Sequence, residues 1–334
     1  MSETPSLNPR RIMLLGATGT IGRATAQALV DKGHEVVCFI RHAVNDPRQG
    51  LPDGVILRFG DVTDSASLQT AGFAGESFDA LVSCLASRSG SPADAWAIDH
   101  MAHLQALHLA RLAGISHMVL LSAICVQRPL LAFQQAKLAF EKVLTESGIA
   151  YSIVRPTAFF KSLSGQVERV RKGHPFLIFG DGQLTACKPI SDADLGRYLA
   201  DCLDDTSRLN RILPIGGPGP AITPLQQGAH LFHLLGRPPK YRKVPVAMMT
   251  GIIGALTVLG RLSPKLRDKA DFAQIGRYYA TESMLVLNPE TGLYDADATP
   301  STGTETLFDF YASLINRETS VDLGAHAAFQ RKTA

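Results

Sequence analysis

The stretch "LLGATGTIG", Leu14 to Gly22, decides the fold of this 334-residue chain. Its three glycines have G-x-x-G-x-x-G spacing, between an apolar run and a helical pattern. Glycine permits a tight turn and close approach of the backbone to a pyrophosphate, and the helix that follows supplies unpaired N–H groups. We therefore predict a dinucleotide site formed by Gly16, Thr18, Gly19, Thr20, Ile21 and Gly22.

The first 155 residues alternate apolar runs with helical patterns. The runs are rich in Val, Ile and Leu at consecutive positions, which is typical of strands buried on both faces. We expect strands within 10–16, 34–41, 54–61, 78–86, 117–126 and 149–156, and helices within 20–33, 93–114 and 135–148. This order predicts an α/β fold with a Rossmann-like doubly wound parallel sheet.

The second half mixes short strands with helices, expected at about 191–204, 222–236, 246–262, 268–281 and 304–317. We interpret it as a smaller, mainly helical lobe beside the strand C-termini, where ligands bind in such folds. The predicted division is an NADP-binding domain at 1–165, a substrate-binding lobe interleaved with the sheet at 166–320, and a flexible tail at 321–334.

The composition excludes several classes of partner and ligand. The formal net charge is only +3 without a strongly basic block, which argues against nucleic acid. The five cysteines are scattered and odd in number, which favours reduced thiols. Two histidine pairs, at 100 and 103 and at 230 and 233, lack an accompanying ligand set, so we predict no metal site.

The strand ends carry further candidate cofactor residues. Arg41 follows the second strand, where NAD-binding proteins place a carboxylate, so NADPH is favoured, although Arg41 is alternatively a surface cation. Asp61 either contacts the adenine or caps a helix. The other candidates end later strands or lie just beyond them: Cys84, Leu85, Ala86, Ser122, Lys137 and Pro156.

The segment "FQQAK", Phe133 to Lys137, departs from a known pattern. It is similar to the Tyr-x-x-x-Lys of short-chain dehydrogenases, whose tyrosine moves a proton during carbonyl reduction, but phenylalanine takes the tyrosine position. Lys137 is predicted to hold the nicotinamide ribose; its alternative is a solvated helix lysine.

Taken together, the glycine motif, Lys137 and "VRP" (Val154 to Pro156) resemble the atypical short-chain dehydrogenases of the NmrA-like and isoflavone-reductase-like group. Three longer stretches, Arg155 to Val170, Phe179 to Gly196 and Tyr278 to Tyr311, resemble NADPH-dependent 3,8-divinyl chlorophyllide 8-vinyl reductases. The likeness spans nearly the whole chain.

That resemblance implies reduction of the 8-vinyl group of divinyl chlorophyllide or protochlorophyllide to ethyl. Hydride goes to the outer vinyl carbon, and the inner carbon is then protonated by Lys137, by Lys161 or by water. A vinyl group has no oxygen to protonate, which accounts for an apolar residue at 133. The expected catalytic residues are Lys137 and Lys161, and the expected substrate contacts are Phe133, Phe159, Phe160 and Lys161, with core packing the alternative for Phe159 and Phe160.

The chain begins without a long transit segment, from which we expect a bacterial, cytoplasmic protein. Val244 to Gly260 is uncharged but too short to span a bilayer, so it either forms a wall of the pocket or touches a membrane surface. Peripheral association with the photosynthetic membrane stays open. Two rival functions are a non-catalytic NADP-binding redox sensor or assembly factor, and a reductase of quinones or phenylpropanoid-like double bonds.

Overall fold

The computed structural model describes residues 9–42, 46 and 48–319, and its centre is a seven-stranded sheet. All six strand pairings are parallel, and the order is β3-β2-β1-β4-β5-β6-β8. The strands are β1 Arg11–Leu15, β2 Glu35–Ile40, β3 Ile56–Phe59, β4 Ala80–Ser83, β5 His117–Leu121, β6 Ala150–Pro156 and β8 Arg211–Ile215. This confirms the predicted Rossmann-like doubly wound sheet.

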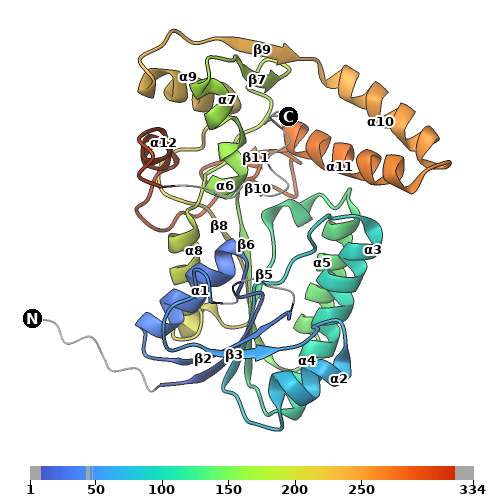
Figure 1. Cartoon of the computed structure of the whole chain (residues 1–334), viewed down its shortest axis with the longest axis vertical. Helices are drawn as coiled ribbons and strands as arrows, with labels where there is room; N and C mark the ends of the chain where they lie inside the picture. The colour runs from blue at the N-terminus through green and yellow to red at the C-terminus, as the bar shows by residue number, and fades with distance from the viewer. Residues whose placement is uncertain (1–8, 43–45, 47, 320–334) are drawn as a thin grey trace, which may run out of the picture.

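Helices cover both faces of the sheet (Figure 1). One face packs on α1 (Thr20–Asp31) and α8 (Asp192–Asp201), and the other on helices that include α4 (His103–Leu112) and α5 (Ala132–Thr145). The helix expected at 93–114 is divided into α3 Pro92–Ala95, the π-helical turn η2 Trp96–Ala102 and α4. Short segments missed by the sequence are α2 Ser65–Ser67, the π-turn η1 Leu68–Phe73 and the 3₁₀ turn η3 Ile124–Gln127.

The later part of the chain builds a second core, which contains residues of α9, α11 and α12. The helices in this part of the chain are α6 Phe160–Leu163, the 3₁₀ turn η4 Ser164–Gln166, α7 Val167–Arg171, α9 Pro224–Leu234, α10 Val246–Gly260, α11 Pro264–Thr281 and α12 Leu307–Ile315. Its strands are β7 Phe176–Phe179 paired with β9 Tyr241–Val244, and β10 Val286–Leu287 paired with β11 Tyr294–Asp295. The predicted flexible tail, 321–334, lies outside the described residues.

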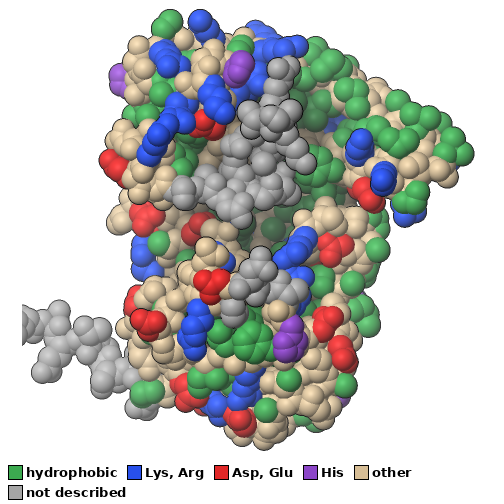
Figure 2. All heavy atoms as spheres, in the orientation of Figure 1, with side chains coloured by type: hydrophobic (Ala, Val, Ile, Leu, Met, Phe, Trp, Pro, Cys, Tyr) green, Lys and Arg blue, Asp and Glu red, His purple; other side chains and the backbone are tan. Residues whose placement is uncertain are grey.

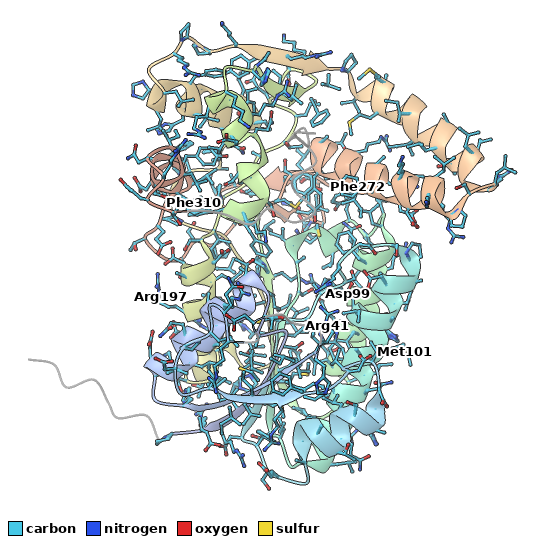
Figure 3. The ribbon with its side chains drawn as sticks, in the orientation of Figure 1. Arg41, Asp99, Met101, Arg197, Phe272 and Phe310 are labelled. Carbon is cyan, nitrogen blue, oxygen red and sulfur yellow. The ribbon has the colours of Figure 1, made fainter. Side chains whose placement is uncertain are left out.

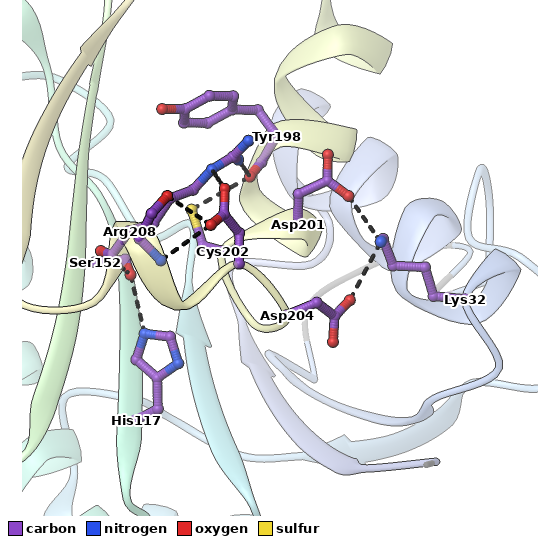
Figure 4. Close-up of polar contacts among 10 residues, drawn as sticks. Lys32, His117, Ser152, Tyr198, Asp201, Cys202, Asp204 and Arg208 are labelled. Carbon is purple, nitrogen blue, oxygen red and sulfur yellow. Dashed lines mark hydrogen bonds and ion pairs between the residues drawn. The ribbon is translucent and has the colours of Figure 1, made fainter. Parts of the chain in front are cut away.

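β8 follows β7 in sequence but pairs with β6 in the large sheet. The turn η5 (Thr206–Arg208) before β8 is held by Arg208, whose guanidinium lies 4.1 Å from the Tyr198 ring centroid and donates to the Tyr198 carbonyl (Figure 4). Ser152 on β6 donates to the Arg208 carbonyl at 2.9 Å. On the same side, Lys32 after α1 bridges Asp201 and Asp204 at 2.7 and 3.2 Å.

The hairpin of α10 and α11 projects from the body (Figure 1). No residue of α10 is buried. Within the described residues, no helix combines the length and the apolar character that crossing a membrane requires. The hairpin is therefore an exposed apolar arm.

The close packing of α8 on α1 leaves no room for a side chain at Gly196. A Cβ added at Gly196 would lie 2.6 Å from the backbone carbon of Ala24, so we expect Gly196→Ala to lower the free energy of unfolding by about 1–3 kcal/mol through overpacking. Urea denaturation measures this. Gly276→Ala is the matched control, because nothing lies within 4 Å of that position, and it should be neutral or stabilising by up to about 1 kcal/mol. Equal effects of the two variants would contradict the close packing.

Candidate active site

The glycine turn joins β1 to α1 at the C-terminal edge of the sheet. Gly16 has φ +80°, and a Cβ there would lie 2.6 Å from the Cys84 carbonyl carbon. A Cβ at Gly22 would lie 2.1 Å from the Gly16 oxygen, so the fold itself requires both glycines. At Gly19 a Cβ would make only an ordinary contact, 3.4 Å from the Gly16 oxygen, so the fold itself does not require this glycine.

The start of α1 fits a dinucleotide pyrophosphate. Gly19 is the N-cap and offers no side-chain hydrogen bond, which leaves the first N–H groups of the helix available. Cys84 follows β4 against this turn, with its Sγ 3.6 Å from Thr25 Oγ1. Burial raises the pKa of Cys84 to about 12, so it stays a neutral thiol. Leu85 and Ala86 continue along the same edge.

Arg41 and Asp61 lie at the ends of β2 and β3, and Figure 3 marks Arg41 there. The Asp61 carboxylate accepts bonds from the Thr63 backbone N–H and hydroxyl at 2.9 and 2.7 Å. These bonds, and then the charge of Arg41, lower the pKa of Asp61. The N-cap of α2 is Asp64, so Asp61 closes a turn and does not cap the helix. Its predicted contact with adenine stays a prediction.

Lys137 on α5 forms a buried ion pair that the sequence did not reveal. Its Nζ lies 3.0 Å from Oδ1 of Asp99, and the two side chains are 10% and 0% exposed. The pair excludes the alternative of a solvated helix lysine. Asp99 comes from the π-helical turn η2 (Figure 3), and its Oδ2 has no hydrogen-bond partner among the described residues. The only hint in the sequence is that Asp99 is the one acidic residue in the mostly apolar stretch "AWAIDHMAHL".

His103, beside this pair, is a neutral structural residue. Its Nδ1 donates to the Ile98 carbonyl at 2.8 Å, which leaves Nε2 to accept from the Ser83 hydroxyl at 2.9 Å. Burial, together with the charge of Lys137, lowers the pKa of His103 to about 4. The described residues contain no group of three or more His, Cys, Asp or Glu suited to a metal ion.

Ser122 and Pro156 end their strands inside the sheet. The Ser122 hydroxyl donates to Glu141, which also pairs with Arg155. That hydroxyl is therefore engaged within the protein, and Pro156 is the buried last residue of β6. Their contacts with a cofactor stay predictions.

Lys161 lies at the glycine turn. Its Nζ donates to Thr20 Oγ1 at 3.4 Å, which places the ammonium beside the start of α1. Its charge also acts against the effect of burial on Asp192, whose pKa is raised to about 6. The position suits a phosphate of the cofactor better than the far end of a substrate.

The two adjacent phenylalanines after β6 divide between two cores. Phe160 is 3% exposed, in the second core, with its ring centroid 5.5 Å from that of Phe310. Phe159 is half-buried against the sheet core. Phe160 thus has the core packing that the sequence left as its alternative.

Phe133 is half-buried, one turn before Lys137 on α5, and α11 packs over it. A Cβ at Gly90 would lie 2.9 Å from Ile275 Cδ1 and 3.6 Å from Phe133 Cδ1. The next turn of α11 carries Tyr278 and Tyr279, whose hydroxyls both reach Cys125. The sequence did not single out either tyrosine.

Comparison with known proteins agrees with this geometry. An NAD(P)H-binding family model matches residues 16–206, which confirms the predicted NADPH cofactor at the level of a nicotinamide dinucleotide. The leucoanthocyanidin reductase of Vitis vinifera, solved with NADPH, superimposes with a TM-score of 0.66 at 16% identity, over 92% of this chain and 99% of that one, and shares its fold.

Two curated relatives are much closer in sequence. The chloroplastic divinyl chlorophyllide a 8-vinyl-reductase of Oryza sativa subsp. indica is 49% identical over 91% of this chain and 78% of its own length. The enzyme of the same name from Arabidopsis thaliana is 47% identical over 91% and 76%. Because these relatives are chloroplastic plant proteins, the expectation of a bacterial, cytoplasmic protein is wrong. The chain belongs to the divinyl chlorophyllide a 8-vinyl-reductase family of oxidoreductases, built on an NAD(P)H-binding fold.

Proposed function

We propose that this protein reduces the 8-vinyl group of divinyl chlorophyllide to an ethyl group with NADPH. The observation that carries the proposal is identity of 47–49% with reductases of that name over nine-tenths of the chain. The site agrees with it, because a buried lysine is retained while phenylalanine replaces the tyrosine of carbonyl reductases. The same identity disfavours both rivals, the NADP-binding redox sensor or assembly factor and a reductase of other double bonds.

When bound, NADPH supplies the hydride. The residues that hold it in this proposal are the glycine turn, the N–H groups that begin α1, and the ammonium of Lys161 beside Thr20. Arg41, at the end of β2, binds the 2′-phosphate, for which a guanidinium fork is suited. Arg23, on α1, extends along the Gly50 backbone near the same edge and contributes further positive charge.

Lys137 orients the nicotinamide ribose in this proposal. Asp99 fixes the direction of its ammonium, since a buried charge needs a partner that offsets the cost of desolvation. The other donor positions of the ammonium remain for a ribose hydroxyl. The pair thus provides a rigid cation at the place where the reductase scaffold needs one.

The substrate is a flat, mostly apolar macrocycle, and the proposed site for it is the hollow between the α10–α11 hairpin and the Rossmann half. Figure 2 shows hydrophobic side chains along that hollow. Phe133 and Ile275 meet nearby, across Gly90. We therefore keep the proposed division of the chain, with a cofactor domain at 1–165 and a substrate lobe at 166–320 that contributes α8 and β8 to the sheet.

A peripheral contact with an anionic bilayer is part of the proposal. The α10 segment carries no charge and buries none of its residues, and Leu262, just beyond it, is 86% exposed. Hydrophobic side chains gather over the hairpin in Figure 2. An exposed apolar helix too short to span fits the interface of a lipid layer.

Basic residues beside the apolar arm favour lipid over a second protein copy. Arg242 and Lys243 precede α10, and Arg261 follows it, all exposed. A hollow of about 360 Å³ next to β9 is lined by several cations, namely Arg171, Lys172, Arg237 and Lys240. Positive charge at the border of an apolar surface complements anionic headgroups.

The function is tested by mixing purified protein, NADPH and divinyl chlorophyllide. We expect oxidation of NADPH together with a Soret shift to the monovinyl form, confirmed by a product two hydrogens heavier. Absence of product while NADPH binding is demonstrated by fluorescence would exclude the proposed activity.

Two lysine variants separate cofactor binding from turnover in the same assay. Lys161→Met should raise the NADPH KM about tenfold with little change in kcat, since one charge-assisted contact is lost. Lys137→Met should lower kcat and, by leaving Asp99 unpaired, also reduce the unfolding free energy by about 3–5 kcal/mol. The double variant Lys137→Met with Asp99→Asn should recover stability without activity. Full turnover in both single variants would contradict these roles.

Coenzyme preference tests Arg41. Loss of a hydrogen bond to a charged phosphate costs about 1.5–3 kcal/mol, so Arg41→Ala should raise the NADPH KM roughly tenfold to a hundredfold and leave the NADH KM within about twofold. Steady-state kinetics with both coenzymes measures this. Arg111→Ala, at an exposed position on α4, is the control and should change neither value.

Vesicle sedimentation tests whether the α10–α11 hairpin binds a lipid surface. We expect binding to phosphatidylcholine vesicles that contain phosphatidylglycerol, weakening with added salt, and loss of binding in Ile252→Asp with Val258→Asp. Leu112→Asp, at a leucine on α4 that is more exposed than either of those residues, should bind normally. Unchanged binding of the double variant, or a concentration-dependent dimer that it abolishes without any vesicle binding, would contradict the lipid assignment.

A further inference from the structure

A phenol is absent from α5 but is supplied by α11. Phe133 and Lys137 are four residues apart and share one face of α5. Ile275 and Tyr279 have the same spacing on α11 and share a face of that helix. Ile275 and Phe133 both lie next to Gly90, so the two helices approach each other at that point.

The Tyr279 hydroxyl points inward from that face. It lies 3.9 Å from the Sγ of Cys125, on the turn η3 directly after β5. The residue as a whole is 45% exposed, so the side chain is accessible to a ligand. Ligands bind beyond the C-terminal ends of such strands, which is where this hydroxyl lies.

The thiol of Cys125 is in contact with the Tyr279 hydroxyl. Burial raises the pKa of Cys125, and both the hydrogen bond from Tyr279 and the charge of Lys137 act against that increase. Tyr279 thus contacts this thiol, and Lys137 acts on it through its charge, although the two residues come from different helices.

We propose that Tyr279 is the catalytic proton donor of the reduction, an inference that rests on the proposed function. Two electrons and one hydrogen reach the outer vinyl carbon as hydride, which breaks the π bond and forms the first new C–H bond. The resulting charge on the inner carbon and macrocycle takes the proton from the Tyr279 hydroxyl, which forms the second. Solvent then protonates the phenolate.

The surroundings of Tyr279 suit this role. Burial raises its pKa well above the ordinary value, so the hydroxyl holds its proton throughout the neutral range. The phenol of a carbonyl reductase extends from the same helix as the lysine; here the substrate lobe delivers it from the opposite side.

The hydroxyl of the neighbouring Tyr278 is engaged in backbone hydrogen bonds and is not available to a ligand. Its hydroxyl donates to the carbonyls of Cys125 and Arg128, at 2.8 and 3.1 Å, and the residue is 4% exposed. It holds α11 on the turn η3 and so has a structural role. Lys161 is also unsuited, because its ammonium lies at Thr20 beside the cofactor turn.

The test compares Tyr279→Phe with Tyr278→Phe in the full-length protein. Tyr279→Phe should lower kcat by about 10²–10⁴. The KM for divinyl chlorophyllide, NADPH affinity by fluorescence, and tetrapyrrole affinity by absorbance titration should remain near wild type. Its solvent deuterium isotope effect should rise above that of the wild type, because proton transfer from water becomes rate-limiting. Tyr278→Phe should lower the thermal midpoint and retain most of kcat.

The outcomes distinguish this inference from the proposed function. An inactive wild-type protein that binds NADPH would overturn both. An active wild type with a Tyr279→Phe variant of unchanged kcat would overturn the inference alone. A slower variant with an unchanged isotope effect, or with equally weakened tetrapyrrole binding, would also overturn it, because Tyr279 would then act only in packing or binding.

Discussion

The close approach of three backbone segments at the glycine turn is the constraint on which the rest of the structure depends. Gly16 adopts a left-handed conformation against the carbonyl of Cys84, and Gly22 touches the Gly16 oxygen. This contact sets the direction in which α1 leaves the sheet. α8 then packs on α1 through Gly196, and the turn that follows α8 leads β8 to its place beside β6. The glycine turn thus sets the position of α1 at the C-terminal edge of the sheet and, through α8, the position of β8.

A second constraint is electrostatic. The ion pair of Lys137 and Asp99 is almost fully withdrawn from water, and a pair of that kind costs several kcal/mol of desolvation that its own attraction barely offsets. Such a pair contributes little to stability. Its effect is to hold the ammonium of Lys137 in a fixed direction against Asp99.

The helix α11, from the second half of the chain, brings a tyrosine hydroxyl to the turn after β5. Ile275 of α11 lies near Phe133 at Gly90, and Tyr279, one turn later on α11, reaches Cys125 on the turn η3. The apolar hairpin formed with α10 extends outward from the same helix (Figure 1).

Local sequence determined the alternation of strands and helices, the parallel sheet, the cofactor turn and the position of Lys137, because each leaves a pattern within a few residues. Only the tertiary structure decided the partner of that lysine, the place of Lys161 beside Thr20, the burial of Phe160 and the meeting of Tyr279 with Cys125. The three pairwise contacts join residues that are 38 to 154 positions apart in the sequence. The burial of Phe160 depends on the whole second core. Packing at such separation follows no periodicity along the chain, so the amino-acid sequence read locally contains no signal for it.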